Sequence, residues 1–410
     1  MTGTDPAQAG LSDPRLAKQS AQNRLQGRVT ERVLIVQVDF GDLDLGEAVQ
    51  EVRMLAESAG AEVADVMTCR RDRPDVALFV GSGKATEIAH RANELDAGLI
   101  IFNHALSPVQ QRNLEQVVHG RVIDRTTLIL DIFALRAQSA EGKLQVELAQ
   151  LEHLASRLIR GWTHLERQRG GIGLRGPGET QLETDRRLIG QRVKMLKERL
   201  ARLARQRKTQ GRARSRQGVL TISLVGYTNA GKSTLFNALT HSGAYAADQL
   251  FATLDTTSRR VFLAPGEFMV LSDTVGFIRE LPHSLIEAFK STLHEAADAD
   301  LLLHVIDASD PDREAHQHAV EAVLQEVGAG DVPRIEVMNK IDLIGLAPKS
   351  EPDPCGRIRR VWLSAADGRG VDLLREAVRS HTPAYPDPNR AEALFGDHDN
   401  QVQPSVQSLL

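Results

Sequence analysis

The stretch GYTNAGKS, residues 226–233, lies between an apolar segment, VLTISLV, and a segment with helical spacing, TLFNALTHS. It matches the pattern GxxxxGK[ST], in which the amides of a glycine-rich loop and the N-terminus of the following helix bind phosphate oxygens. In this pattern Lys232 reaches the terminal phosphates and Ser233 is a ligand of Mg²⁺. Strand, loop and helix in this order predict a P-loop nucleotide-binding domain.

Three further motifs follow in the order that guanine-nucleotide binding requires. DTVG (273–276) ends the strand-like segment FMVLSD, so Asp273 can hold an Mg²⁺-bound water and the glycine amide can face the γ-phosphate. NKID (339–342) follows RIEVM, and Asp342 can accept two hydrogen bonds from a guanine edge, which adenine does not offer in that form. LSA (363–365) ends the last strand-like segment. The four motifs together predict a GTP-binding site.

A switch loop is expected between the phosphate loop and DTVG, in DQLFATLDTTSRR, residues 248–260. Such a loop needs a threonine that responds to Mg²⁺ and the γ-phosphate. We choose Thr253, with Thr256 and Thr257 as alternatives.

Two residues depart from the commonest GTPase pattern. Phe277 follows DTVG where many GTPases place a glutamine that orients the attacking water, so hydrolysis by the chain alone is predicted to be slow. Asn229 resembles the phosphate-loop asparagine of potassium-stimulated GTPases, and its side-chain oxygen can hold K⁺ beside the β and γ phosphates. The alternative is that Asn229 only stabilises the loop.

The predicted site has catalytic, metal-binding and nucleotide-contacting residues. The catalytic residues are Lys232, Thr253, Gly276 and Asn229, and the Mg²⁺ ligands are Ser233, Thr253 and, through water, Asp273. The residues predicted to contact the nucleotide are Gly226, Tyr227, Thr228, Asn229, Ala230, Gly231, Lys232, Ser233, Thr234, Phe251, Ala252, Thr253, Leu254, Asp255, Asp273, Thr274, Val275, Gly276, Asn339, Lys340, Ile341, Asp342, Ser364, Ala365 and Ala366.

Two α/β domains are predicted, at 32–140 and 219–382, with flexible tails at 1–31 and 383–410. Each domain alternates short apolar runs with helical patterns, which indicates a mostly parallel sheet with crossover helices. In the first domain the expected strands are VLIVQV (33–38), DVALFVG (75–81), GLIIF (98–102) and RVID (121–124). In the second they are VLTISLVG, EFMVLSD, LLLHVIDAS, RIEVMNK and IRRVWLSA. GSGK (81–84) is expected to be a tight turn between strand and helix, and a second nucleotide site there is the less favoured alternative.

Residues 141–218 are predicted to form an antiparallel helical hairpin with a glycine-rich tip at 170–178 and a basic linker at 211–218. The hairpin is expected because apolar residues recur at heptad-like intervals on either side of the glycine run. Between residues 151 and 218 the chain carries 18 Lys or Arg against 6 Asp or Glu, although its net charge is −4. Such a density favours a nucleic-acid surface over a merely solvated face. The seam residues are Leu144, Leu148, Leu151, Ala155, Leu158, Trp162, Leu165, Leu182, Ile189, Val193, Leu196, Leu200 and Leu203.

Composition indicates the compartment in which the protein works. The chain is 41% apolar and 25% charged, its two cysteines lack metal-ligand spacing, and its N-terminus lacks a signal-peptide pattern. No apolar run approaches the length of about 18 residues that a membrane helix needs. We therefore expect a cytoplasmic, monomeric protein without a membrane segment.

The chain resembles the HflX family of ribosome-associated GTPases. The resemblance spans about residues 32–382 and depends most on EGKLQVELAQL (141–151) and RGGIGLRGPGETQLETDRR (169–187), together with FVGSGK, GYTNAGKST, LFATLD, DTVGFI and NKID. It implies a GTPase that converts GTP to GDP and phosphate, binds the large ribosomal subunit and its RNA through the hairpin, is stimulated by ribosomes, and splits or rescues stalled or idle ribosomes. The family usually has proline after LD, where this chain has Thr256. The alternatives are a GTP-controlled binding switch for a protein partner and an RNA-remodelling ATPase that uses the N-terminal domain.

Overall fold

The chain forms two compact units, which meet in sequence between Arg125 and Thr126. The computed structural model describes residues 31–41, 44–162, 177–216, 219–240, 250–264, 267–279, 285 and 289–381. Most of the predicted tip at 170–178, and the predicted tails apart from Glu31, lie outside these residues. Among the helices in the described ranges, none is both long enough and apolar enough to span a bilayer.

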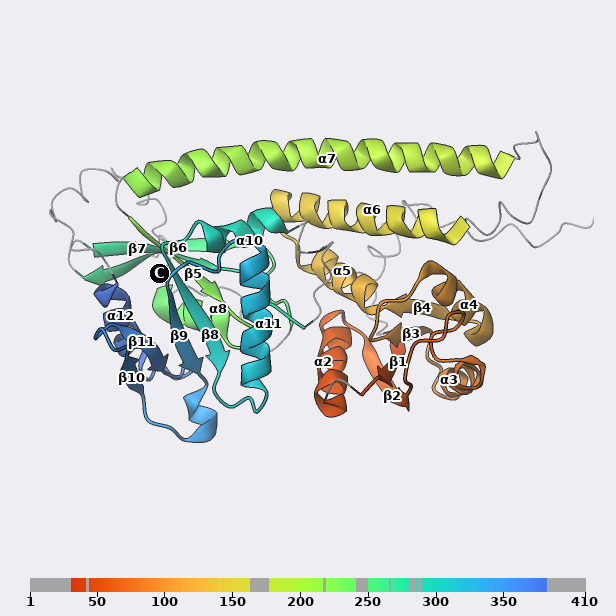
Figure 1. Ribbon diagram of the computed structural model, residues 1–410, viewed down its shortest axis with the longest axis horizontal. Helices are drawn as coiled ribbons and strands as arrows, with labels where there is room; N and C mark the ends of the chain where they lie inside the picture. Colours follow the sequence, from red (N-terminus) through yellow and green to blue (C-terminus); the bar gives the residue numbers. More distant parts are fainter. Residues whose placement is uncertain are drawn as a thin grey trace, which may run out of the picture. The chain divides into compact units, whose positions relative to one another are not determined.

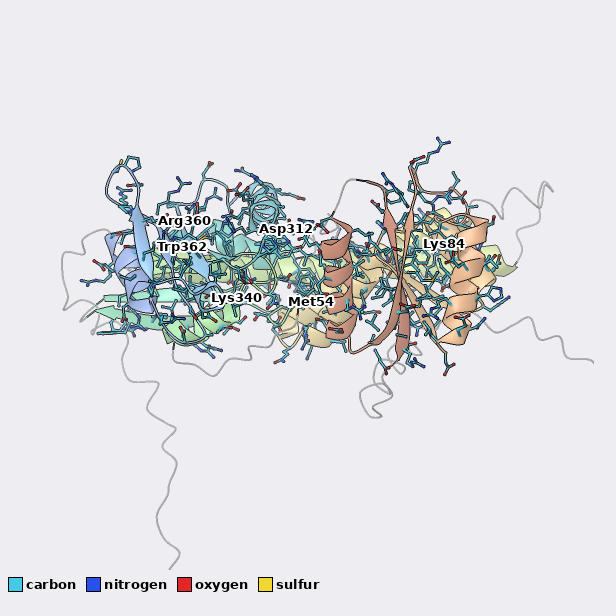
Figure 2. The ribbon with its side chains drawn as sticks, turned by 90° about the horizontal axis from the view of Figure 1, so that it is seen from below. Met54, Lys84, Asp312, Lys340, Arg360 and Trp362 are labelled. Atoms are coloured by element: carbon cyan, nitrogen blue, oxygen red, sulfur yellow. The ribbon has the colours of Figure 1, made fainter. Side chains whose placement is uncertain are left out.

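The first unit is built on a fully parallel four-stranded sheet in the order β2-β1-β3-β4. Parallel neighbours require crossover connections, and helices between the strands cover both faces of this sheet, α2 on one and α3 on the other (Figures 1 and 2). Met54 of α2 and Lys84 of α3 mark these two helices in Figure 2. The predicted α/β class is confirmed. The elements are β1 (Arg32–Asp39), α2 (Leu45–Ser58), β2 (Glu62–Arg70), α3 (Ser82–Glu94), β3 (Leu99–Phe102), α4 (Pro108–Val118) and β4 (Arg121–Asp124), with α5 (Arg125–Arg136) leading into the second unit.

The predicted strand at 75–81 is wrong, because this segment is a tight turn. The Asp75 carboxylate accepts hydrogen bonds from the amides of Ala77 (2.9 Å) and Leu78 (2.7 Å), and Phe79 has a φ of +62°. The fourth strand is instead β2, which sequence analysis missed because its residues are mostly half-buried and do not form a continuous apolar run. GSGK therefore begins α3 after a turn and lacks the strand that precedes a phosphate loop.

The second unit contains a seven-stranded sheet in the order β10-β11-β9-β8-β5-β7-β6. Its inner strands are parallel, and only β10 and β6, at the two edges, pair antiparallel with their neighbours. The five predicted strands are present as β5 (Leu220–Val225), β7 (Glu267–Asp273), β8 (Leu301–Asp307), β9 (Arg334–Asn339) and β11 (Ile358–Trp362). The two edge strands of this sheet, β6 (Thr257–Ala264) and β10 (Lys349–Pro352), were not predicted.

Helices cover this sheet on both faces. Ile222 and Leu224 of β5 belong to a core that also contains residues of α8 (Lys232–Thr240) and α12 (Val371–Ser380). Ser223 points to the opposite face, where its hydroxyl donates to the Glu295 carbonyl of α10 (Lys290–Ala297) at 3.1 Å. Figure 1 shows α11 (Arg313–Glu326) alongside β8. Because β5, β7 and β9 run in the same direction, their carboxyl ends lie at one edge of the sheet, where the predicted motifs lie.

The predicted hairpin is a pair of antiparallel helices, α6 (Ala140–Trp162) and α7 (Pro177–Arg216) (Figure 1). Leu148 packs with Leu196 and Leu200, while Leu144, Leu151 and Val193 are half-buried against them. Two ion pairs cross the hairpin, from Glu147 to Arg192 and from Glu152 to Lys197, each at 2.7 Å. α7 extends to Arg216, through most of the stretch that was predicted to be a linker. Residues 211–216 contain no proline, and their one glycine, Gly211, costs a helix only about 1 kcal/mol.

Candidate functional site

The phosphate loop leaves the end of β5 and requires glycine at two positions. Gly226 has a φ of +148°, and a Cβ there would lie 2.2 Å from the Val305 carbonyl oxygen. Gly231 has a φ of +92°, and its Cβ would lie 2.2 Å from the side-chain nitrogen of Asn339. Both the backbone conformation and the close neighbours exclude any side chain. These glycines let the loop turn tightly between β8 and the NKID segment.

Lys232 is the first residue of α8 and is buried within the loop. Its ammonium donates hydrogen bonds to the carbonyls of Gly226 (3.0 Å) and Tyr227 (2.7 Å). Burial lowers the pKa of Lys232 to about 8, and the charge of Asp273 opposes this shift. A cation is thus held inside the loop, where phosphate oxygens would be stronger partners than carbonyls.

Three predicted metal-binding residues come together at the start of α8. The Ser233 and Thr253 hydroxyls are 2.8 Å apart, and they donate to Asp273 Oδ2 at 2.8 and 3.0 Å respectively. The second oxygen of Asp273, Oδ1, is buried and has no hydrogen-bond partner among the described residues. Burial raises the pKa of Asp273, and the nearby Lys232 opposes this rise. Two hydroxyl oxygens beside a carboxylate that has one unpaired oxygen are a set of ligands that fits Mg²⁺.

DTVG is held directly against the phosphate loop. The Thr274 hydroxyl donates to the Leu224 carbonyl at 2.6 Å, and a Cβ on Gly276 would lie 2.9 Å from the Lys232 ammonium. The Phe277 amide donates to the Gly226 carbonyl, and the Phe277 carbonyl accepts from an amide of the same loop. The phenyl ring of Phe277 is buried. It therefore has neither the chemistry nor the exposure to orient a water molecule.

The segment expected to bind the base is organised by Asn339. Its side chain donates to the Ala230 carbonyl of the phosphate loop and accepts from the Ala365 amide, both at 2.9 Å. Lys340, labelled in Figure 2, has a φ of +63° and pairs with Asp307 at 2.7 Å. Asp342 is exposed in the short 3₁₀ helix that follows, so its carboxylate is accessible to a ligand.

Of the three candidate threonines, Thr253 is the one that the structure places against Ser233 and Asp273. Thr256 donates instead to the Glu295 carboxylate at 3.0 Å, and Thr257 begins β6. Asn229 has a φ of +61°, a left-handed conformation that asparagine tolerates better than most residues. This conformation is a reason for asparagine at this position that is independent of K⁺.

Two sets of contacts at the site had no signal in the sequence, since their members are far apart along the chain. The ring of Tyr227 stacks on His316 of α11, with centroids 3.8 Å apart, and its hydroxyl accepts from the Arg279 amide at 3.0 Å. The Asp255 carboxylate contacts Gln138 and Ser139, just before α6. The first set joins the phosphate loop to the segment after DTVG, and the second joins the switch loop to the hairpin.

The chain matches three family models in succession. Residues 46–134 match "GTP-binding GTPase N-terminal", residues 136–224 match "GTP-binding GTPase Middle Region", and residues 221–340 match "50S ribosome-binding GTPase". The third match contains the phosphate loop, the switch loop, DTVG and the first residues of NKID.

Curated relatives align over most of the chain. GTPase HflX of Escherichia coli is 55% identical over 85% of this chain and 82% of its own length. GTPase HflX of Caldanaerobacter subterraneus subsp. tengcongensis is 47% identical over 86% of this chain and 80% of its own. For GTPase HflX of Magnetococcus marinus the identity is 49% over 80% of this chain and 76% of that protein. With such identity over about four-fifths of the length of these relatives, and with a complete P-loop site, the chain belongs to the HflX family of GTPases.

Proposed function

We propose that this chain is a GTP-hydrolysing translation factor that binds the large ribosomal subunit and splits or rescues stalled or idle ribosomes. The observation that carries the proposal is the convergence of Ser233, Thr253 and Asp273 beside a phosphate loop. The same residues lie in the segment 221–340, which matches a model described as a 50S ribosome-binding GTPase. A nucleotide-controlled cycle in the cytoplasm would then drive binding to the ribosome and release from it.

In this proposal the phosphates of GTP lie over residues 226–233. Lys232 exchanges its carbonyl partners for phosphate oxygens, and the Gly276 amide faces the γ-phosphate. Ser233, Thr253 and, through water, Asp273 would hold Mg²⁺. When bound, the ion supplies positive charge to the β and γ phosphates. Asn339 keeps the base-binding segments in place, and Asp342 selects guanine.

Turnover by the chain alone is slow in this proposal. Phe277 takes the position of a water-orienting glutamine and is buried, so the ribosome or its RNA must complete the hydrolytic site. K⁺ held by Asn229 is a further proposed source of positive charge beside the phosphates.

The hairpin is the proposed ribosome-binding element. Arg187, Lys194 and Arg205 are exposed on α7 and are separated by 7 and 11 residues, which correspond to nearly whole numbers of helical turns. They therefore form one basic stripe, on the face of α7 opposite Leu196 and Leu200. A stripe of cations along a helix suits the phosphates of RNA.

Sedimentation with purified ribosomal subunits tests this function. We expect the protein to pellet with the large subunit in a non-hydrolysable GTP analogue and to stay in the supernatant in GDP. Adding ribosomes should raise the rate of GTP hydrolysis, and light scattering should report subunit dissociation. Unchanged hydrolysis and the same distribution in both nucleotides would instead favour a switch for a protein partner.

A further inference from the structure

The carboxylate of Asp255 ties the switch loop to the start of helix α6. Asp255 Oδ2 accepts hydrogen bonds from the amides of Gln138 and Ser139, both at 2.7 Å, and Oδ1 accepts from the Ser139 hydroxyl at 2.5 Å. The same hydroxyl accepts from the Gly142 amide at 2.8 Å, so it caps the first turn of α6. An anion is favoured there because the first amides of a helix lack internal acceptors and carry partial positive charge.

Glycine in the first turn of α6 makes room for this carboxylate. A Cβ on Gly142 would lie 2.0 Å from Asp255 Oδ1 and 3.1 Å from the Ser139 hydroxyl oxygen. Glycine inside a helix costs about 1 kcal/mol relative to alanine, so its presence here has no benefit for the helix itself. The benefit is the close approach of Asp255.

A second contact holds the other end of the same loop. The ring of Phe251 meets the ring of Phe133 in α5 edge-on, with centroids 4.7 Å apart, and Phe289 contacts Phe133 in the same manner at 4.8 Å. All three rings are buried. Thr253 lies midway between Phe251 and Asp255. The loop that presents the Thr253 hydroxyl is therefore held at one end by α5 and at the other by the start of α6, the first helix of the hairpin.

We propose that Asp255 is a positioning residue for GTP hydrolysis. By capping the N-terminal end of α6, it holds Thr253 beside Ser233 and Asp273, where Mg²⁺ would bind. This inference rests on the proposed role of Thr253 at Mg²⁺. It makes α6 a structural part of the hydrolytic site, so any movement of the hairpin that pulls α6 from Asp255 changes the placement of Thr253. Because such coupling is reciprocal, the nucleotide also sets the position of the hairpin.

The substitution Gly142→Ala tests the inference from the helix side, without changing any residue of the switch loop. Alanine strengthens the helix, so unfolding of α6 is not expected, but its methyl group displaces Asp255. We expect affinity for a non-hydrolysable GTP analogue in Mg²⁺ to fall about tenfold, as loss of charged hydrogen bonds predicts. GDP affinity should stay at the parent value, because the switch threonine responds to the γ-phosphate and its Mg²⁺. Gly190→Ala in α7 is the matched control, since a Cβ there meets nothing within 4 Å.

Asp255→Ala and the double variant Asp255→Ala/Gly142→Ala complete the experiment. If Gly142→Ala acts through Asp255, the double variant should bind the analogue no more weakly than Asp255→Ala alone. Analogue affinity at the parent level in both single variants would overturn the inference, as would full additivity in the double variant. Thr253→Ala distinguishes the proposed role of Thr253 from the coupling through Asp255. If Thr253→Ala leaves the affinity for the analogue unchanged, the proposed role of Thr253 fails. If it is the only variant that lowers this affinity, only the coupling through Asp255 fails.

Discussion

Lys232 shows how burial in the phosphate loop ties nucleotide affinity to pH. In the protein without nucleotide its pKa is lowered to about 8 by burial, and bound phosphates would raise it again. Below pH 8 the ammonium is already charged, so binding takes up little proton. Above pH 8 the lysine is mostly neutral and must gain a proton, which weakens binding.

We therefore expect GDP affinity to fall about tenfold between pH 7 and pH 9, with uptake of nearly one proton per nucleotide at the higher pH. Calorimetry in two buffers with different ionisation enthalpies measures both quantities. Lys232→Arg is the control, because a guanidinium stays charged throughout and any remaining pH effect belongs to the nucleotide. Equal parent affinities at the two pH values would show that the buried ammonium keeps its ordinary pKa.

Single residues also show why part of the site was predictable and part was not. GYTNAGKS, DTVG and NKID are local patterns whose spacing carries their chemistry, so sequence alone brought Lys232, Asp273 and Asn339 to one site. The contact of Asp255 with Ser139 joins residues more than a hundred positions apart. It depends on how α6 begins relative to the switch loop, and no periodicity encodes that.

At the scale of elements, strands were predictable where both faces are buried. β1, β3 and β8 are mostly apolar, are buried along nearly their whole length and pair with parallel neighbours on both sides. β2, β6 and β10 lie at sheet edges and contain charged or polar residues, so they lack this pattern. The false strand at 75–81 is apolar, but Asp75 turns the chain back on itself. Side-chain capping by one residue outweighed the apolar pattern of its neighbours.

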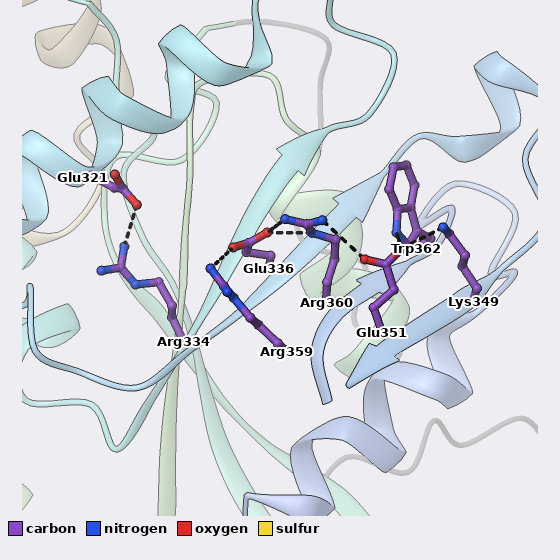
Figure 3. Close-up of polar contacts among 8 residues, drawn as sticks. All are labelled: Glu321, Arg334, Glu336, Lys349, Glu351, Arg359, Arg360 and Trp362. Atoms are coloured by element: carbon purple, nitrogen blue, oxygen red, sulfur yellow. Dashed lines mark hydrogen bonds and ion pairs between the residues drawn. The ribbon is translucent and has the colours of Figure 1, made fainter. Parts of the chain in front are cut away.

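The edge formed by β9, β11 and β10 is held by a ladder of charges (Figure 3). Glu336 accepts from Arg360 at 2.7 Å and from Arg359 at 3.4 Å, and Arg360 donates in turn to Glu351 at 3.3 Å. The Trp362 ring nitrogen donates to the same Glu351 at 3.1 Å. Cross-strand pairs of this kind fix register and discourage pairing of the edge with another chain.

Removing the largely buried member of this ladder, Glu336, should cost more stability than removing one partner of an exposed ion pair. The Glu336 side chain is 13% exposed, so Glu336→Gln should lower the free energy of unfolding by about 1–2 kcal/mol. In Glu321→Gln, the control, the side chain is 47% exposed and pairs with Arg334, so the loss should be below about 0.5 kcal/mol. Urea unfolding compares the two. Equal losses would mean that the ladder is no stronger than a surface pair.

At the scale of the whole molecule, the charges are segregated between hairpin and remainder. The hairpin region from 151 to 218 carries 18 basic against 6 acidic residues in a chain of net charge −4. The remaining residues are therefore acidic overall and would be repelled by RNA. This asymmetry favours an orientation in which the hairpin alone approaches a polyphosphate surface.

Replacing Arg187, Lys194 and Arg205 with glutamine should therefore weaken ribosome binding while leaving GDP affinity unchanged. Each lost phosphate contact should reduce the slope of log affinity against log salt by about one, because fewer counterions are released. The control replaces Arg112, Arg313 and Arg357, three exposed arginines outside the hairpin, and alters net charge by the same amount. Sedimentation with large subunits at several salt concentrations measures the slopes. The basic stripe on α7 is the RNA contact only if the two triple variants differ in slope, since a general effect of charge would change both alike.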